Sequence, residues 1–449
     1  MNIAFICTGE FEPFLYECIA KQLEKDDIHV YYAAFFLNIR RAIRRVNRRP
    51  YPEQISPGNL SGTDLEKQSV FDRKTQEQII EYDYLRLHAN GQQIKQETLI
   101  RQVLNYERFF ADFYQEKDIG AIVIWNYFPI MVNVAWRLAR KMNLKTIFFE
   151  NGPLRNTLLI DTHGINYQSS LTQKKRSFYE QVVIDDQLWM PFIIEYKIGR
   201  QKLPRANKGI MSLFFKFGYA LLMRNRFYRR RFPDLAADTI MQSVYKKLYS
   251  KYLLKEKTLV LPEKFVFLPL QCSCDTQILI NSSNIKNMDD FVKIAYRAIK
   301  KALPKDYKIV VKETPDDWGR INYEHLKKRY PDIIWLQKCN ISDLIEKADL
   351  IVTINSSVAI EALTYYKPVV TLGLSYFNIE GVVYHVRDLD NFEDILKTAV
   401  KESVNQELIN KFLYYLRFKY LVPGSPAYCD EPSLTAAYNR IKKILLENN

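Results

Sequence analysis

Two stretches of the chain alternate short hydrophobic runs with longer segments whose apolar residues have helical spacing. In the first stretch, the pattern predicts strands at 2–7, 29–34, 121–125 and 145–150, and helices at 13–25 and 131–142. In the second, it predicts strands at 265–270, 307–312, 333–336, 349–354 and 369–372, and helices at 287–303, 322–330, 342–347, 357–365, 390–402 and 405–418. Such alternation is typical of Rossmann-like parallel sheets.

Two polar segments with helical spacing interrupt this alternation, at about 36–116 and at 175–257. The predicted fold class is therefore α/β, with two Rossmann-like domains that face a cleft and carry helical insertions. We place the first domain at 1–174, the basic helical insertion at 175–257, the second domain at 258–420, and a closing helix that packs back at 421–449.

The composition supports large cores and excludes some classes of site. The chain has 449 residues, of which 47% are hydrophobic and 14% aromatic, enough for two cores. Glycine is scarce, with 14 residues, and neither the dinucleotide-binding nor the P-loop glycine pattern occurs. The six cysteines are scattered, and Cys272-Ser273-Cys274 has no histidine near it, so we expect reduced thiols and no zinc site.

The net charge of +14 is concentrated in two arginine clusters, one within 40–49 and one within 224–231. Such clusters bind nucleic acid, anionic lipid or phosphorylated substrates, and a solvated basic face is the simpler alternative. The apolar segment Met211–Tyr228 leads into the second cluster and fits either an interfacial membrane helix or a core helix with a basic end. No nucleic-acid-binding motif occurs, so we expect the partner to be an anionic inner-membrane surface and not nucleic acid.

The apolar runs and the N-terminus bear on localisation. The first residues, Met1–Cys7, have the pattern of a strand and lack the basic start and apolar core of a signal peptide. No run of about 18 apolar residues occurs, so no transmembrane helix is predicted. We therefore expect a cytoplasmic protein that is peripheral to the inner membrane.

Polar residues follow three predicted strands of the second domain, where the strands end. The first group is Gln271, Asp275 and Gln277, the second is Lys312, Glu313 and Thr314, and the third is Ser356, Ser357 and Glu361. Because parallel strands end at one edge of a sheet, these groups should lie together and suit a nucleotide phosphate. For the third group alone, a serine helix cap and a glutamate that pairs locally are the simpler explanation of the pattern.

The chain resembles the bacterial capsule polysaccharide biosynthesis family, which includes retaining β-Kdo glycosyltransferases. Three segments within roughly 120–390 carry the resemblance: Phe149-Glu150-Asn151-Gly152-Pro153-Leu154 with Asp161-Thr162-His163-Gly164-Ile165-Asn166, Pro269-Leu270-Gln271 to Asp275-Thr276-Gln277, and Thr353-Ile354-Asn355-Ser356-Ser357 to Leu363 with Lys367-Pro368-Val369 and Leu372-Gly373. The resemblance implies a GT-B-type enzyme that moves Kdo from CMP-Kdo to a glycan or glycolipid acceptor by double displacement, with the donor bound mainly by the second domain.

The resemblance also implies roles for individual residues. Asp275 matches the nucleophile and Glu150 the acid/base. We assign the donor contacts to Lys312, Thr314, Ser356, Ser357, Glu361, Gln271 and Gln277. We assign the acceptor side or cleft to Asn151, Gly152, Arg155 and His163. We expect neither a metal nor another cofactor, since a lysine and helix N-termini are assigned to the donor phosphate.

Structural alternatives stand beside these roles. Asp275 also suits a helix or turn cap, Glu150 also suits a hydrogen bond to the turn that follows it, and His163 also suits a turn residue. Family members usually have Lys-x-His-Pro where this chain has Lys312-Glu313-Thr314-Pro315. The loss of a cation favours, as the alternative, a different donor such as a sialic acid-like or neutral hexose nucleotide. A compensating role for Arg155 or Arg320 is a further hypothesis.

Overall fold

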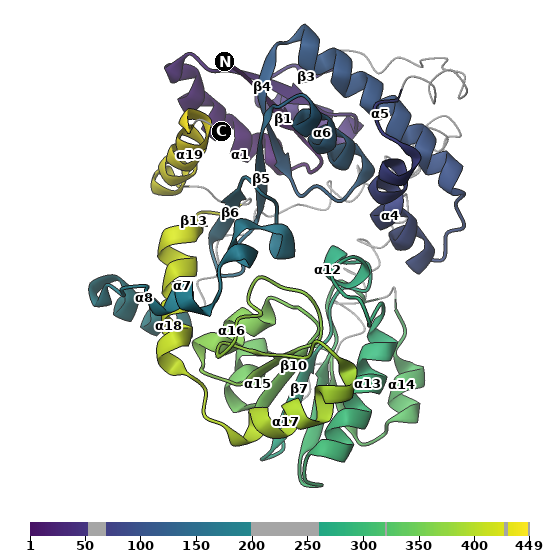
Figure 1. Ribbon diagram of the computed structural model, residues 1–449, viewed down its shortest axis with the longest axis vertical. Helices are drawn as coiled ribbons and strands as arrows, with labels where there is room; N and C mark the ends of the chain where they lie inside the picture. Colours follow the sequence, from purple (N-terminus) through teal and green to yellow (C-terminus); the bar gives the residue numbers. More distant parts are fainter. Residues whose placement is uncertain (53–68, 199–259, 319–320, 426–429, 448–449) are drawn as a thin grey trace. The chain divides into compact units, whose positions relative to one another are not determined.

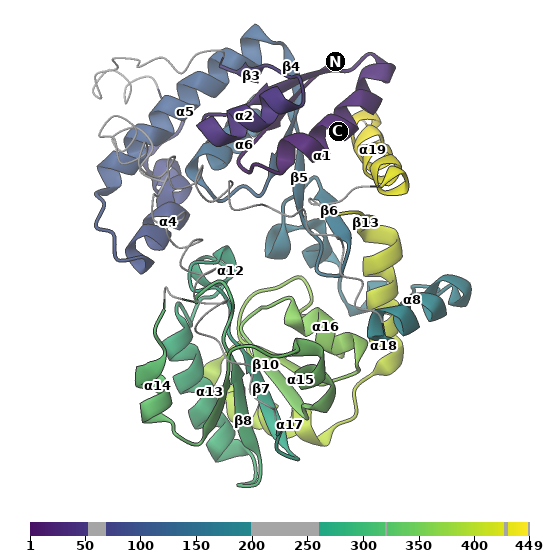
Figure 2. The same cartoon turned by 180° about the vertical axis from the view of Figure 1, so that it is seen from behind.

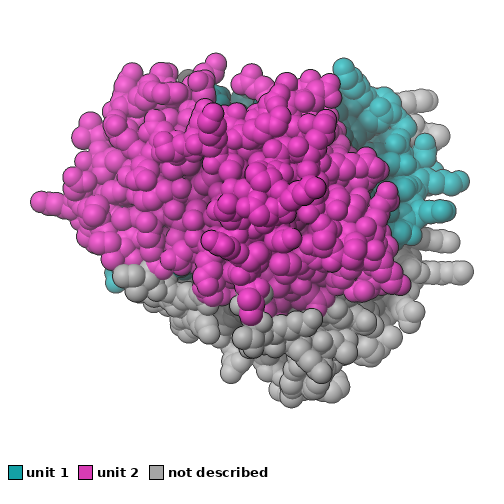
Figure 3. All heavy atoms as spheres, turned by 90° about the horizontal axis from the view of Figure 1, so that it is seen from below, with its two compact units in different colours: residues 1–173, 203–205, 416–449 teal, residues 174–202, 206–415 magenta. Residues whose placement is uncertain are grey.

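The computed structural model describes residues 1–52, 69–198, 260–318, 321–425 and 430–447. The chain divides into two compact units, which Figure 3 colours separately. The described residues of 1–173 and 416–449 form unit 1, and those of 174–202 and 206–415 form unit 2. In this division residues 174–198 belong to unit 2, and the chain returns to unit 1 at Leu416, slightly earlier than the boundary at 421 that we inferred from the sequence.

Unit 1 is built on a seven-stranded sheet with the order β13-β6-β5-β4-β1-β2-β3 (Figure 1). The strands are β1 (Asn2–Ile6), β2 (His29–Ala33), β3 (Pro50–Tyr51), β4 (Ile119–Trp125), β5 (Lys145–Asn151), β6 (Thr157–Asp161) and β13 (Val422–Pro423). The strands from β3 to β5 are parallel, whereas β6 and β13 run antiparallel to their neighbours. The central strands β1 and β4 are almost wholly buried, as expected for a sheet covered on both faces.

Helices cover both faces of this sheet, as the two opposite views in Figures 1 and 2 show. They are α1 (Glu12–Leu23), α2 (Leu37–Arg45), α4 (Arg73–Ala89), α5 (Gln96–Glu116), α6 (Ile130–Lys141) and α19 (Glu431–Leu446). One core joins alternate strand residues such as Phe5 and Phe149 to α1, α2 and α19. On the other face α6 contacts β4 and β5, and α5 packs against α6.

Unit 2 contains a six-stranded, wholly parallel sheet with the order β12-β11-β10-β7-β8-β9. The strands are β7 (Phe265–Pro269), β8 (Lys308–Lys312), β9 (Ile333–Leu336), β10 (Leu350–Thr353), β11 (Val369–Thr371) and β12 (Tyr384–His385). The helices are α7 (Arg176–Glu180), α8 (Asp186–Ile198), α12 (Thr276–Leu279), α13 (Met288–Ala302), α14 (Glu324–Arg329), α15 (Ile341–Lys347), α16 (Val358–Thr364), α17 (Phe392–Lys401) and α18 (Gln406–Tyr415). One core packs α13, α14 and α17 against the sheet, whereas α16 contacts β10 and β11.

The two Rossmann-like α/β units and their long strands confirm the predicted fold class. The pattern missed β3, β6, β12, β13 and the one-turn helix α12, all of which have five residues or fewer. The segment 36–116 is not purely helical, because β3 joins the edge of the sheet. The predicted helix at 405–418 ends at Tyr415, and a π-helical turn at Leu416–Tyr420 leads into β13. The segment Met211–Tyr228, the second arginine cluster and Arg320 lie outside the described residues.

Asp161, at the end of β6, joins three separate parts of unit 1. This buried carboxylate accepts hydrogen bonds from the backbone N–H groups of His163 (2.7 Å) and Ser170 (2.9 Å) and from the Ser170 hydroxyl (2.7 Å). It also accepts a bond of 2.5 Å from the Tyr420 hydroxyl, 259 residues further along the chain. This carboxylate therefore adds to the pairing of β13 with β6 in fastening the returning C-terminal segment to the sheet.

We expect Asp161→Asn to lower the free energy of unfolding by about 2–4 kcal/mol, because an amide turns two donor N–H bonds toward groups that already donate. Urea unfolding followed by circular dichroism measures this free energy.

Tyr420→Phe should lower the free energy of unfolding by about 1.5–3 kcal/mol, since it removes one hydrogen bond to a carboxylate. The exposed Asp112 serves as control, and Asp112→Asn should change stability by less than about 0.5 kcal/mol. An equal effect of both aspartate variants would contradict the role given to Asp161.

Candidate functional site

The loop after β7 places Asp275 at the start of the one-turn helix α12. A turn closes from the Asp275 N–H to the Cys272 carbonyl at 2.9 Å. The half-buried Asp275 carboxylate accepts a bond from the Gln277 N–H at 2.9 Å and one from the Thr276 hydroxyl at 3.2 Å. Burial raises the pKa of Asp275, these two bonds oppose the rise, and the charge of Asp316 adds to it. Asp275 is thus a helix cap, and this position also keeps its carboxyl at the carboxyl-terminal edge of the sheet.

The side-chain amide of Gln271 makes its hydrogen bonds within the protein. Its Nε2 donates to the Asn355 Oδ1 at 3.0 Å, and its Oε1 accepts from the Thr353 hydroxyl (3.3 Å) and the Asn355 N–H (3.2 Å). The side chain is 8% exposed and therefore joins the ends of β7 and β10. These bonds favour a positioning role for Gln271 over direct contact with a donor.

Asn355 is one of two residues at this edge that our sequence reasoning overlooked. Its Nδ2 lies within hydrogen-bond distance of three carbonyl oxygens, those of Gln277 (2.8 Å), Asn281 (3.2 Å) and Leu374 (3.2 Å). An asparagine directly after a buried strand and before two serines was the available signal, since amide side chains commonly satisfy loop backbone. The Nε2 of Gln277 is buried and has no hydrogen-bond partner among the described residues. That unused donor supports Gln277 as a ligand contact.

The loop after β8 brings a cation to the same edge. Lys312 is half-buried, and its ammonium donates to the Glu313 carbonyl at 3.3 Å. Burial lowers the pKa of Lys312, while Cys339 and Glu313 oppose this change. The Glu313 carboxylate turns away and pairs with Lys327 at 3.1 Å. Thr314 is half-buried, and its hydroxyl accepts from the Asp316 N–H at 3.4 Å, so Lys312 supplies the positive charge of this loop.

Asp317, a buried carboxylate that our sequence reasoning also overlooked, joins the loop after β7 to the loop after β8. Asp317, 1% exposed, accepts bonds from the Ser273 hydroxyl (2.6 Å) and N–H (3.2 Å) and from the Tyr323 hydroxyl (2.9 Å). The loops that carry Asp275 and Lys312 are therefore fixed to each other within unit 2. Spacing along the chain gave no sign of this, because Ser273 and Asp317 are 44 residues apart.

The loop after β10 contributes two serines and leads into α16. The Ser356 hydroxyl accepts from the Val358 N–H at 3.2 Å, whereas Ser357 is exposed and its side chain makes no cap bond. Glu361 accepts a bond of 3.0 Å from the Ser342 hydroxyl on α15. This local pairing is the simpler alternative considered above for Glu361, and its place as a donor contact stays a prediction.

The residues assigned to the acceptor side lie around the β5–β6 hairpin of unit 1, with one exception. Glu150 is half-buried near the end of β5, and its carboxylate accepts from the Asn151 N–H at 2.9 Å. Gly152 approaches the next strand so closely that a Cβ would lie 2.0 Å from the Thr157 hydroxyl oxygen. Arg155 lies in the turn of this hairpin, whereas His163 follows the opposite end of β6 and is half exposed. The hairpin therefore groups Glu150, Asn151, Gly152 and Arg155 but not His163.

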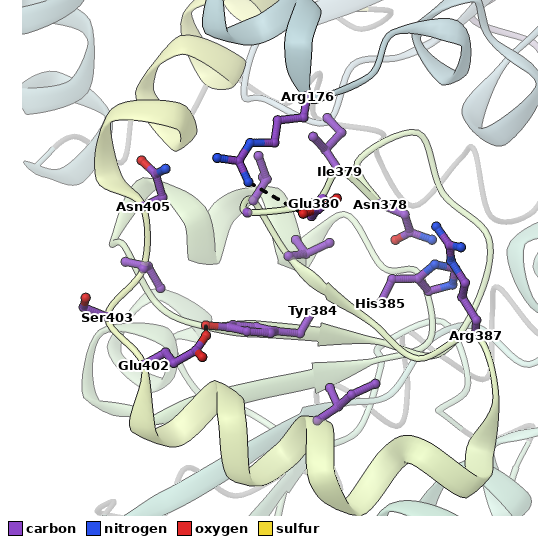
Figure 4. A pocket seen from close by; sticks show the side chains of 15 residues that line it. Arg176, Asn378, Ile379, Glu380, Tyr384, His385, Arg387, Glu402, Ser403 and Asn405 are labelled. Atoms are coloured by element: carbon purple, nitrogen blue, oxygen red, sulfur yellow. Dashed lines mark hydrogen bonds and ion pairs between the residues drawn. The ribbon is translucent and has the colours of Figure 1, made fainter.

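Unit 2 also contains a cavity of about 520 Å³ at its edge strand β12 (Figure 4). Its lining includes Arg176, whose guanidinium lies 3.7 Å from the Glu380 carboxylate, and Tyr384, whose hydroxyl donates to Glu402 at 3.3 Å. None of the residues that we assigned from the sequence lines it. Within the described part of the chain, no helix is long and apolar enough to cross a membrane, and no group of three or more His, Cys, Asp or Glu is arranged to hold a metal.

Comparisons with known proteins agree with the family resemblance. A family model described as "Capsule polysaccharide biosynthesis protein" matches residues 120–422. Protein FixF of Sinorhizobium fredii (strain NBRC 101917 / NGR234) is 28% identical over 298 residues, which are 65% of this chain and 58% of FixF. The capsule polysaccharide export protein KpsS of Escherichia coli is 23% identical over 300 residues, which are 62% of this chain and 72% of KpsS. The chain therefore spans less than two thirds of the length of FixF.

Among solved structures, the KpsC beta Kdo 2,4 transferase of Thermosulfurimonas dismutans has 17% identity and a TM-score of 0.39, covering 76% of this chain and 95% of that one. The KpsC beta Kdo 2,7 transferase of the same organism has 15% identity and a TM-score of 0.37, covering 75% and 89%.

The cap geometry predicts how substitutions at Asp275 affect stability. Asp275→Asn should keep the free energy of unfolding within about 0.5 kcal/mol, because asparagine caps a helix as well as aspartate. Asp275→Ala should lose about 1 kcal/mol, because the N–H of Gln277 loses its acceptor. Urea titration of the three proteins measures both values. A loss in the asparagine variant as large as that in the alanine variant would contradict the cap.

Proposed function

The chain belongs to the capsule polysaccharide biosynthesis protein family, and from this premise we propose that it is a retaining glycosyltransferase that transfers Kdo from CMP-Kdo to a surface-polysaccharide acceptor carried on a lipid. One observation carries the proposal: a carboxyl, an amide with an unused donor, an ammonium and hydroxyls meet at the carboxyl-terminal edge of the unit 2 sheet. In open α/β sheets ligands bind at this edge. The donor identity comes from the three segments that resemble β-Kdo transferases.

The proposed chemistry has two inversions at the anomeric carbon. An oxygen of the Asp275 carboxylate attacks that carbon while its bond to the CMP phosphate oxygen breaks, and CMP leaves. The acceptor hydroxyl then attacks the same carbon, displaces Asp275 and gives its proton to Glu150. Lys312 offers a positive charge to the phosphate, so the proposal needs no metal ion. Because burial raises the pKa of Asp275, activity should fall with decreasing pH earlier than for an exposed aspartate.

A second donor class is favoured by one observation, the neutral Thr314 where relatives usually have histidine. A hydroxyl holds a phosphate less strongly than a cation does, so the nucleotide would gain more of its affinity from other contacts. A sialic acid-like or neutral hexose nucleotide is the alternative donor. Product masses from a panel of nucleotide sugars separate the two.

We expect intact-protein mass spectrometry to show a gain of one Kdo unit after the wild type meets CMP-Kdo without acceptor, because the first inversion leaves the sugar on Asp275. Asp275→Asn should show no gain. The control is Asp306→Asn, which removes an exposed carboxylate just before β8, at the opposite end of that strand from Lys312, and should still gain one Kdo unit.

The possible results test the donor and the nucleophile separately. A gain in the wild type and the control but not in Asp275→Asn supports both donor and nucleophile. CMP release with acceptor but no gain keeps the donor and overturns Asp275 as the nucleophile. Neither gain nor CMP release with CMP-Kdo, together with product from another nucleotide sugar, overturns the donor.

We further propose that the protein docks on an anionic membrane surface through α2. The arginines of this first cluster divide into two sets. Arg40 is buried and donates to the Ala34 carbonyl at 2.9 Å, and Arg48 pairs with Glu17 (2.7 Å) and Glu24 (2.6 Å). The remaining members are exposed and take part in no ion pair among the described residues; they are Arg41, Arg44, Arg45 and Arg49. The opposite side of α2 is buried, so the helix holds this charge outward.

Replacing these four exposed arginines with glutamine should weaken binding to phosphatidylglycerol vesicles, measured by flotation, by on the order of 1,000-fold, because each contributes about 1 kcal/mol near an anionic surface. The wild type should also lose binding as salt rises. The control removes the same charge from exposed lysines of unit 2: Lys301, Lys305, Lys397 and Lys401. Equal loss in both variants would show that net charge alone, and not α2, determines binding.

A further inference from the structure

A carboxyl group that the proposed chemistry does not use is buried at the start of α1. Glu12 is 1% exposed and accepts hydrogen bonds from the Thr8 N–H (2.7 Å) and the Thr8 hydroxyl (2.8 Å). No ion pair in the described residues includes Glu12. A buried carboxyl without a counter-charge is costly when ionised, so the site favours the neutral acid.

The loop between β1 and α1 is shaped around this carboxyl. A Cβ on Gly9 would lie 2.9 Å from Glu12 Oε1 and 2.8 Å from the ring of Phe11. Phe11 in turn meets Trp125 of β4 edge-on, with ring centroids 5.0 Å apart. Tyr16, one turn further along α1, meets Phe149 of β5 edge-on at 5.8 Å. These aromatic contacts therefore fasten the residue before Glu12 to β4 and the next turn of α1 to β5.

The strand register brings Glu12 toward Glu150. Ile6 is level with Ile124 on β4, which is level with Phe148 on β5. Two residues further along, Thr8 and Glu150 reach the same edge of the sheet, separated by two strand spacings or about 10 Å. The Glu12 carboxyl is bound to Thr8, so the two carboxyl groups share this edge. The sequence showed only a glutamate in a turn, because the pairing depends on β4 lying between β1 and β5.

The charges around Glu12 agree with this geometry. Burial raises the pKa of Glu12 to about 8, bonds from Thr8 and the Gly9 backbone oppose the rise, and the charge of Glu150 adds to it. The other titratable groups that face it are Cys7, directly after β1, and Tyr16 of α1, and burial also raises the pKa of each. Both are neutral near pH 7, which leaves Glu150 as the charged neighbour.

We propose that Glu12 is a positioning residue for Glu150: as a neutral acid it holds the β1–α1 loop and adds no second negative charge beside Glu150. This inference rests on the proposed function for the role of Glu150. A single carboxylate can take the proton of an acceptor hydroxyl. A second charge from ionised Glu12 would compete for that proton and repel a donor sugar that itself carries a carboxylate.

The first arm of the test measures unfolding by urea between pH 5 and pH 9 and needs no substrate. Because native Glu12 keeps its proton above the pH at which the unfolded chain loses it, wild-type stability should fall as pH rises from about 5 to about 8. Glu12→Gln, which mimics the neutral acid, should lose most of this fall. Glu81→Gln, on the exposed side of α4, should keep it.

Two neighbouring substitutions should move this transition in opposite directions. Glu150→Gln removes a like charge and should shift the fall to lower pH. Thr8→Ala removes a hydrogen bond that lowers the pKa of Glu12 and should shift the fall to higher pH. A transition unchanged by Glu150→Gln, or still present in Glu12→Gln, would overturn the proposal. If Glu12→Gln does not fold, these two variants with the wild type decide the same question.

The second arm measures the pH dependence of kcat/KM for CMP release. Glu12→Gln should stay within about threefold of wild type at pH 6.5 and keep its activity at least about one pH unit further into the alkaline range. A purely structural role predicts a uniform loss at every pH, and that result would overturn the positioning role. If no nucleotide sugar is turned over even by the wild type, the proposed function fails, and the unfolding arm still decides whether Glu12 and Glu150 are coupled.

Discussion

The side-chain amide of Asn355 fixes the edge of unit 2 on which every proposed donor contact lies. Its nitrogen reaches three carbonyl oxygens from two loops, and its oxygen accepts from Gln271 at the end of β7. An unpaired buried amide would cost about 1–3 kcal/mol, so these loops are held by a strong requirement for satisfied hydrogen bonds. Asp317 adds the loop after β8 through Ser273. Asp275 and Lys312 are thus placed by groups that need not touch a substrate.

In unit 1, buried carboxyl groups rather than an amide hold loops and segments together. Asp161 joins β6 to the returning segment at Tyr420, so residues before and after unit 2 in the chain share one core. Glu12 fastens the β1–α1 loop beside Glu150. Buried polar groups are specific because few arrangements satisfy all of their bonds, and a proposed acid/base benefits from such a fixed setting.

The fold also decides which arginines of the first cluster face solvent. Six arginines within 40–49 look equivalent in the sequence, yet Arg40 and Arg48 are used to hold α2 and its neighbours in place. Buried apolar residues such as Ile39 and Ile43 fix the inner side of α2, and this leaves the other arginines as an outward cationic face. Such a face suits a flat anionic surface, because three of the four exposed arginines lie along α2 and the fourth follows it, and none lines the cavity at β12.

The sequence by itself determined the α/β class and the long parallel strands, because apolar runs such as 121–125 and 350–353 must be covered on both faces wherever they occur. It also indicated Asp275, Lys312 and Glu150 as residues at strand ends, since that position follows from local pattern alone. The strand β6 was missed because it returns from β5 through a short turn with no helix between them, which departs from the strand–helix alternation. The helix α12 was missed because a single turn shows no periodicity. Only the tertiary structure decided that the side chain of Gln271 is bound inside the protein and that His163 lies at the end of β6 opposite the hairpin turn. It also decided that Asn355, Asp317 and Glu12 hold the loops of the proposed site. These roles depend on contacts between residues far apart in the chain or on strands that only folding brings together.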